Sequence, residues 1–161
     1  RKGSKERGGK EKQREKKDKK KLQKGGTRKN RSKPPNKNRS HIVKVFLEIL
    51  NMVKLYHWKT RSYAQHNATD ELYDKLNKHI DMFVEVLLGK SESRIKMLEK
   101  KIDLLDPSNV RDFKERIYEY REFLIDIDIY FNSKKDTDLL NIRDEILGDI
   151  NQFLYLMTFD K

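Results

Sequence analysis

Apolar residues recur in residues 40–161 at the three- and four-residue spacing that is typical of helices with one buried face. The first such stripe consists of Ile42, Phe46, Ile49, Val53 and His57. Ser40 lies just before it, where a serine hydroxyl can accept a hydrogen bond from a free amide of the first turn. The pattern predicts an amphipathic helix that begins after Ser40 and carries His57 on its buried side.

A second helix is predicted from Ser62 to Leu88, after a turn at Thr60 and Arg61. Ser62 and Gln65 have the spacing of a capping box, and Gly89 is a typical residue at which a helix stops. Its core stripe consists of Thr69, Tyr73, Leu76, Ile80, Phe83 and Leu87. His79 lies off this stripe and is expected at the surface.

A long connection separates these helices from two more. The third is predicted over Phe113–Phe131, and the fourth runs from near Asp136 to Met157 and beyond. Within residues 90–110, helical spacing predicts a short helix before Asp106-Pro107, formed by Ile95, Leu98, Ile102 and Leu105. Four helices with a long second connection predict an all-α, ferritin-like four-helix bundle of up-down-down-up order.

The first forty residues differ from the rest in charge. They hold 19 Lys and Arg against 4 Asp and Glu, whereas the other 121 residues hold 19 against 22. Leu22 is their one apolar side chain, and Gly25-Gly26 and Pro34-Pro35 interrupt any helix. Such a segment cannot bury enough surface to offset its ordering entropy. We predict a disordered tail over residues 1–39 and one folded domain over residues 40–161.

A Lys- and Arg-rich tail without aromatic residues can neutralise phosphates but cannot stack on bases. The expected partner is therefore nucleic acid, bound without sequence preference and in a salt-dependent manner. The densest cations are Lys16, Lys17, Lys19, Lys20, Lys21, Arg28, Lys29, Arg31 and Lys33. The alternative interpretations of such a segment are a nuclear-localisation signal and a tail that keeps the protein soluble.

A second pattern on residues 62–88 consists of potential metal ligands. His66 and Asp70 are one turn apart, as are Asp81 and Glu85, and all four share one face of a helix. Asp70 and Asp81 are about 16 Å apart along the axis, too far to hold one ion together. Either the face carries two half-sites, or a second copy of the helix runs antiparallel and completes two equivalent sites. A solvated charged face is the usual alternative for helical carboxylates.

These residues carry a resemblance to a known family. His57-Trp58, Tyr63-Ala64-Gln65-His66, Asp70-Glu71-Leu72-Tyr73, and Asp81 with Glu85 resemble the signature of the Dps family, the DNA-binding miniferritins. The resemblance covers residues 50–89, with only the architecture shared from there to residue 161.

The resemblance implies a ferroxidase centre between two subunits. His57, His66 and Asp70 would come from one subunit, and Asp81 and Glu85 from its two-fold neighbour. It also implies a twelve-subunit shell that stores ferric mineral. The gap from His57 to His66 is shorter than in bacterial members, which predicts a tighter turn. Trp58 would shield the site, although packing in the core is the more common role of such a residue.

Several absences narrow the chemistry. The chain has no cysteine, and no glutamate stands three residues before a histidine, as in the Glu-x-x-His pairs of other di-iron bundles. No secretion signal is recognisable, and no apolar run approaches a membrane span. Arg1 rather than Met opens the sequence, which leaves room for residues upstream.

The expected function is a DNA-binding, Dps-like ferroxidase that works on iron, although zinc binds such ligands as well or better. The expected location is the nucleoid-associated cytoplasm, or the nucleus or virion for a viral protein. A non-enzymatic genome-packaging protein of a large DNA virus and a nuclear protein-interaction module are the alternatives.

Overall fold

Four α-helices make up the part of the chain that the structure describes. The computed structural model describes residues 36–159. The helices are α2 (Asn36–Lys59), α3 (Tyr63–Ser91), α4 (Val110–Asp126) and α5 (Thr137–Leu156), with 3-10 turns η1 (Ile127–Tyr130) and η2 (Met157–Phe159). No strand occurs in these residues. The prediction of an all-α unit with four helices is confirmed.

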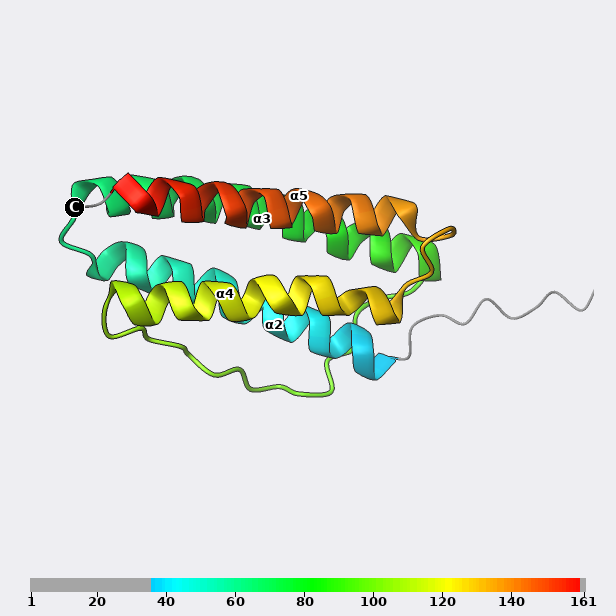
Figure 1. The fold of residues 1–161 in the computed structure, drawn as a ribbon. Helices are drawn as coiled ribbons and strands as arrows, with labels where there is room; N and C mark the ends of the chain where they lie inside the picture. The colour runs from blue at the N-terminus through cyan, green and yellow to red at the C-terminus, as the bar shows by residue number, and fades with distance from the viewer. Residues whose placement is uncertain (1–35, 160–161) are drawn as a thin grey trace, which may run out of the picture. The chain divides into compact units, whose positions relative to one another are not determined.

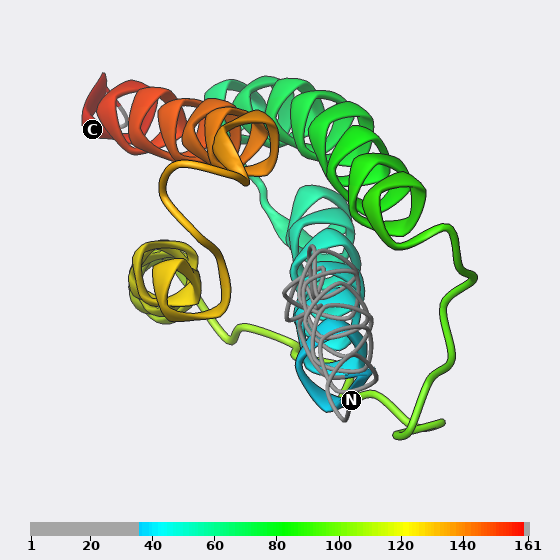
Figure 2. The ribbon, with the colours of Figure 1, turned by 90° about the vertical axis from the view of Figure 1, so that its right-hand side faces the viewer.

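The helices run in alternating directions around a common core. α2 and α5 point one way and α3 and α4 the other (Figure 1). Viewed end-on, α3 lies between α2 and α5, and α4 lies below α5 and beside α2 (Figure 2). Direct packing of α3 on α2 and α5, and of α4 on α5, agrees with this arrangement. Each helix is therefore antiparallel to its neighbours.

Aromatic rings join all four helices through the core. Phe83 of α3 is fully buried and meets Phe46 of α2 edge-on, at 5.4 Å between ring centroids. Phe113 of α4 is stacked on Tyr56 of α2 at 4.0 Å and meets Phe153 of α5 edge-on at 5.9 Å. The predicted stripe from Ile42 to His57 is buried throughout. Burial of these large apolar surfaces is the main source of the unit's stability.

The beginning of α2 differs from the prediction. The helix begins at Asn36, four residues before Ser40, so residues 36–39 belong to the helix rather than to the tail. Ser40 is inside the helix and buried, and its Oγ accepts a hydrogen bond from Leu98 N at 2.9 Å. The N-cap assigned to Ser40 is wrong because its hydroxyl serves a tertiary contact instead.

The short helix expected between α3 and α4 is absent. Residues 92–109, the crossover strap, form no helix, and the side chains of Ser93, Ile95 and Met97 are less exposed than those between them. Alternate burial is the period of extended backbone. Leu98, counted in the expected helical stripe, is 54% exposed. The spacing was misleading because the strap lies against the bundle as an extended chain.

Polar side chains along α2 hold the crossover strap in place. In order along α2, the pairs are Ser40 with Leu98, Lys44 with Glu99, Glu48 with Asp103, and Lys59 with Asp106. The hydrogen bond between Lys44 and Glu99 raises the pKa of the lysine and lowers the pKa of the glutamate. The strap therefore runs parallel to α2 and covers one of its outer faces.

The ends of α3 and α4 also differ from the predictions. Gly89 lies within α3, and Glu92 takes the left-handed conformation that closes the helix, with φ of 48°. The α4 helix ends at Asp126 instead of continuing to Phe131. There the buried Arg143 of α5 donates to Leu124 O at 2.9 Å and so satisfies a carbonyl of the last turn.

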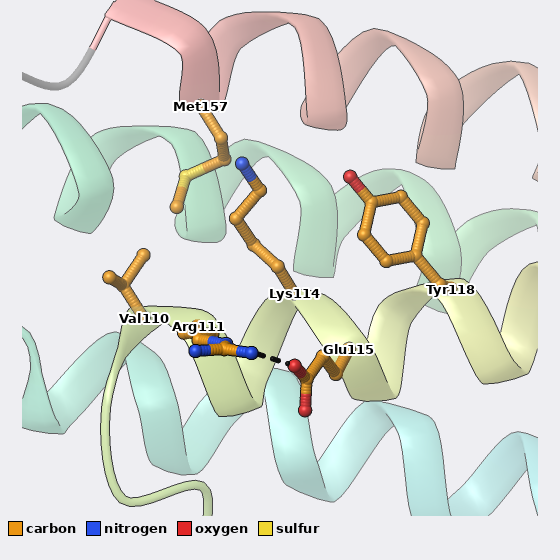
Figure 3. A pocket seen from close by; sticks show the side chains of 6 residues that line it. All are labelled: Val110, Arg111, Lys114, Glu115, Tyr118 and Met157. Carbon is orange, nitrogen blue, oxygen red and sulfur yellow. Dashed lines mark hydrogen bonds and ion pairs between the residues drawn. The ribbon is translucent and has the colours of Figure 1, made fainter.

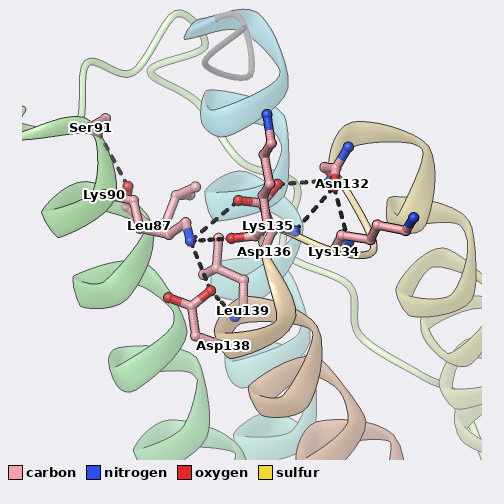
Figure 4. Close-up of polar contacts among 9 residues, drawn as sticks. All are labelled: Leu87, Lys90, Ser91, Asn132, Lys134, Lys135, Asp136, Asp138 and Leu139. Atoms are coloured by element: carbon pink, nitrogen blue, oxygen red, sulfur yellow. Dashed lines mark hydrogen bonds and ion pairs between the residues drawn. The ribbon is translucent and has the colours of Figure 1, made fainter. Parts of the chain in front are cut away.

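A lysine at the end of α3 joins the beginning of α5. Lys90 Nζ donates to Asp138 Oδ1 and to Lys135 O, both at 2.9 Å, and lies 3.3 Å from Asp136 Oδ1 (Figure 4). The hydrogen bond from Lys90 lowers the pKa of Asp138, and the reciprocal interaction raises the pKa of Lys90. Ion pairing thus ties α3 to the α4–α5 loop.

This pair makes stability depend on pH. The depressed pKa of Asp138 means that its contribution is present above the pKa of an unfolded aspartate, about 3.9, and is lost as pH falls through the folded pKa. Asp138→Asn should lower the free energy of unfolding by less than about 1 kcal/mol at neutral pH, because the pair is partly exposed. Urea unfolding should show that this difference disappears in acid. Asp74→Asn, at an exposed position of α3, is the control, and an equal pH dependence for both variants would contradict the assignment.

Candidate metal centre

A three-residue turn between α2 and α3 brings the two predicted histidine ligands together. Ser62 caps α3, and its Oγ accepts a hydrogen bond from Gln65 N at 3.3 Å. Gln65 is buried, and its Oε1 accepts from Tyr56 Oη at 2.7 Å and from Thr60 Oγ1 at 2.8 Å. These bonds fasten the start of α3 to the last turns of α2. The tight turn expected from the short His57–His66 gap is confirmed.

The two imidazole rings are stacked and exchange hydrogen bonds with each other's backbone. Their centroids are 3.9 Å apart, and the ring planes are inclined by 22°. His57 Nδ1 lies 3.0 Å from His66 O, and His66 Nδ1 lies 3.0 Å from His57 O. A carbonyl oxygen can only accept, so each Nδ1 carries the proton. In a neutral ring with this tautomer, Nε2 carries the lone pair, which is the form that binds metals.

A buried threonine reinforces this arrangement. Thr69 is fully buried, and its Oγ1 donates to Gln65 O at 2.7 Å and lies 3.0 Å from His66 O. The same oxygen lies 3.2 Å from His57 Nδ1, where it can accept from that N–H group. Thr69 was predicted as an ordinary core position, and nothing in the apolar spacing indicated that its hydroxyl would hold the imidazole of His57 in place.

Asp70 is the third predicted ligand, and it lies at the edge of this pair. Its Oδ1 is 3.7 Å from His57 Nε2 and 3.9 Å from Lys54 Nζ. Two ligand atoms 3.7 Å apart can both lie about 2.1 Å from one ion, at an angle of roughly 120°. His57 is 7% exposed, whereas the Asp70 side chain is 56% exposed. The pair therefore joins a buried nitrogen to an oxygen that solvent can reach.

The structure does not bring Asp81 and Glu85 to the histidines within one chain. Both are exposed on α3, which continues without interruption from Asp70 to Glu85. The eleven-residue separation between Asp70 and Asp81 therefore keeps its length of about 16 Å. Within residues 36–159 of a single chain, no group of three or more His, Asp or Glu side chains is arranged to hold a metal ion.

Two further predictions about this region need correction. Trp58 does not pack in the core and is 69% exposed. His79 is only partly exposed, and its Nδ1 lies 2.5 Å from Asp149 Oδ2 of α5. The apolar stripe could not reveal this pair, because the partner lies seventy residues away. The tail cations from Lys16 to Lys33 lie outside the described residues, so their role stays a prediction.

Comparison with known proteins identifies a family without giving it a function. The model of a family of unknown function, DUF5856, matches residues 57–157. The chain belongs to this family. The region that DUF5856 covers begins at His57 and includes all five predicted ligands, but not the basic tail. No curated protein and no solved structure matches the chain. No helix in the described part of this DUF5856 member is both long and apolar enough to cross a membrane.

The hydrogen bonds predict one tautomer for both histidines. Above neutral pH, long-range proton–nitrogen NMR correlation spectra should show His57 and His66 protonated at Nδ1 and unprotonated at Nε2. His41 is the internal control, because it is exposed and its ring meets Phe123 edge-on, at 5.9 Å between centroids. It should show the mixed tautomers of a solvated ring. An Nε2–H tautomer in either ring of the pair would contradict the geometry.

Proposed function

We propose that this chain is a Dps-like miniferritin that oxidises Fe²⁺ at sites shared by two copies, stores the ferric product, and binds DNA through its basic tail. The observation that supports this most is the reciprocal hydrogen bonding between each imidazole of the histidine pair and the other residue's backbone carbonyl. Each Nδ1–H donates to the other residue's backbone carbonyl, which leaves Nε2 of each neutral ring available to a metal, and His57 Nε2 lies 3.7 Å from Asp70 Oδ1. A carbonyl behind each ring is the support that metal-binding histidines generally have.

A second copy completes the pocket in this proposal. One chain supplies His57, His66 and Asp70, and the partner's Asp81 and Glu85 supply the remaining oxygens. An antiparallel second α3 carries these acids to the histidine end, because the distance between the two halves is the same on both copies. Such a pair of chains has a two-fold axis and two equivalent sites. The exposure of all three carboxylates leaves them accessible to a partner.

Iron is the substrate in this proposal. Neutral imidazole nitrogen and carboxylate oxygen suit Fe²⁺, and the carboxylates offset its charge. Two Fe²⁺ ions give one electron each to one peroxide molecule, which leaves as water after taking up two protons. The alternating helix directions and the long second connection support a ferritin-like bundle, and the resemblance of the ligand set then implies a twelve-subunit shell. Zn²⁺ competes for the same ligands.

A non-enzymatic genome-packaging protein on the same scaffold is the second candidate. One observation favours it: the two histidines are already paired by stacking and by hydrogen bonds, and no complete metal-binding group lies within the described residues of one chain. The pair would then act as a structural clasp for the turn. In a nuclear protein-interaction module, with the tail as a nuclear-localisation signal, the histidines would have the same structural role.

Iron oxidation separates these candidates. The purified full chain, mixed with Fe²⁺ and peroxide, should form ferric product as measured by absorbance. The double variant His66→Ala with Asp70→Ala should reduce the rate to that of the solution without protein. His41→Ala is the matched control, because His41 is exposed and lies outside the ligand face. The proposal is wrong if the double variant oxidises iron as fast as the control, or if the chain is strictly monomeric by particle mass.

Loss of the tail tests the second half of the proposal. Deletion of residues 1–32 leaves α2 intact from Asn36 and removes 16 Lys and Arg with 4 Asp and Glu, which accounts for the whole net charge of +12. Gel retardation of duplex DNA by the full chain should weaken steeply between about 50 and 200 mM salt, because each phosphate contact releases a counterion. The shortened chain should not retard duplex DNA under any of these conditions. Retardation that survives the deletion would show that the tail is not the duplex-binding segment.

A further inference from the structure

A groove lies at the opposite side of α4 from the crossover strap. It is open to solvent, has a volume of about 400 Å³, and lies between the first turns of α4 and the end of α5 (Figure 3). Its walls are formed by Val110, Arg111, Lys114, Glu115, Tyr118 and Met157. None of these residues belongs to the ligand face of α3. The groove therefore needs its own explanation.

Lys114 gives the groove an unbalanced positive charge. Its side chain extends from α4 toward α5, and it is only partly exposed (Figure 3). Among the described residues it has no ion-pair partner, unlike Lys90 or Lys44. Its partly covered aliphatic stem leaves the ammonium group able to reach a ligand in the groove. The environment of Lys114 therefore favours an anion from outside the helical unit.

Arg111 can supply a second cation. It pairs with Glu115 through Nε at 3.1 Å, but the two side chains are 88% and 59% exposed. Such surface pairs contribute little free energy, so the guanidinium can exchange the carboxylate for a stronger anionic partner. A phosphate group suits this exchange, because guanidinium binds phosphate oxygens through two N–H groups at once.

Tyr118 and Met157 give the groove an apolar, polarisable wall. Tyr118 points into the space between α4 and α5 and is 39% exposed (Figure 3). The Arg121 guanidinium lies 5.0 Å from the centre of its ring and holds the ring by a cation–π contact. Met157, on the α5 side, is buried and presents a flexible thioether. A flat aromatic group fits beside such a ring.

We propose that this groove binds a nucleotide of a single-stranded nucleic acid, with the base against Tyr118 and Met157 and the phosphate on Lys114 and Arg111. A basic surface with an aromatic platform is the general means of binding unpaired strands. In a duplex the bases are paired and stacked on each other, so none is available to stack on Tyr118. The chain's own tail is excluded as the occupant, because its cations would be repelled. This site goes beyond the proposed function, which assigns duplex DNA to the tail and iron to α3.

Fluorescence anisotropy of the full chain with two probes tests the site. The probes are a labelled thymidine single strand and a labelled duplex of the same length. Tyr118→Ala should weaken binding of the single strand about tenfold and leave binding of the duplex unchanged, since base stacking is lost. Tyr118→Phe keeps the ring and should bind both probes as the unchanged chain does. Thermal unfolding of each variant is the control for folding: both variants should unfold near the temperature of the unchanged chain, because the Tyr118 ring is 39% exposed.

A matched charge change tests the phosphate contact. Lys114→Glu should weaken binding of the single strand at least fivefold. Lys134→Glu makes the same change of charge at an exposed position in the α4–α5 loop, at the other end of α4, and should change binding less than twofold. Photo-crosslinking from a thiothymidine strand should label the peptide that contains Tyr118.

Three outcomes would overturn the proposal. Equal weakening of both probes by Tyr118→Ala would mean that no base is recognised. No crosslink near Tyr118 would place the strand elsewhere. Displacement of the strand by an Asp- and Glu-rich peptide, together with an effect of Lys114→Glu but none of Tyr118→Ala, would identify an acidic-peptide site instead. Failure of the tail to bind duplex DNA would leave the single-strand result unaffected, so the two proposals fail separately.

Discussion

The burial of one face of α3 determines which of its side chains lie in solvent. α3 packs against both α2 and α5, and its buried positions include Thr69, Ile80 and Phe83. Asp70 directly follows Thr69, and Asp81 directly follows Ile80. Each is therefore rotated by 100° about the helix axis from a buried residue, away from the core. Packing the apolar side therefore places the acidic side in solvent. The same helix keeps Asp70 and Asp81 apart within one chain, because both lie on the uninterrupted α3.

The turn before α3 adds a second level of order to this simple pattern. Backbone carbonyls of His57 and His66 take both Nδ1 protons, and Gln65 receives hydrogen bonds from Tyr56 and Thr60. Both sets of bonds cross from one helix to the other over only a few residues of chain. The rings are thereby held in one orientation whether or not a metal is their natural partner. A structural clasp and half of a cation site would require the same geometry.

The sequence was sufficient to predict features that depend on local spacing. The four helices, the buried stripe from Ile42 to His57, and the cap at Ser62 all follow from residues within one or two turns of each other. Features that depend on distant partners were not predictable in this way. Ser40 looked like a cap because its partner, Leu98, is far along the chain, and His79 looked exposed because Asp149 is on another helix. The apolar spacing at Ile95–Leu105 fitted a helix, but an extended segment lying on the bundle satisfies it through different contacts.

The crossover strap, when extended, is about as long as the part of α2 that it accompanies. From Leu98 to Asp106 it has eight steps, which span at most about 26–29 Å when fully extended. The stretch of α2 from Ser40 to Lys59 that it accompanies is about 28 Å long at 1.5 Å per residue. The extended length of the strap therefore matches the length of the helix beside it. The long side chain of Lys59 bridges the remaining distance to Asp106 and Pro107. Loss of several residues from this segment would leave too little chain to reach both ends of this stretch of α2, whereas an added residue could bulge into solvent.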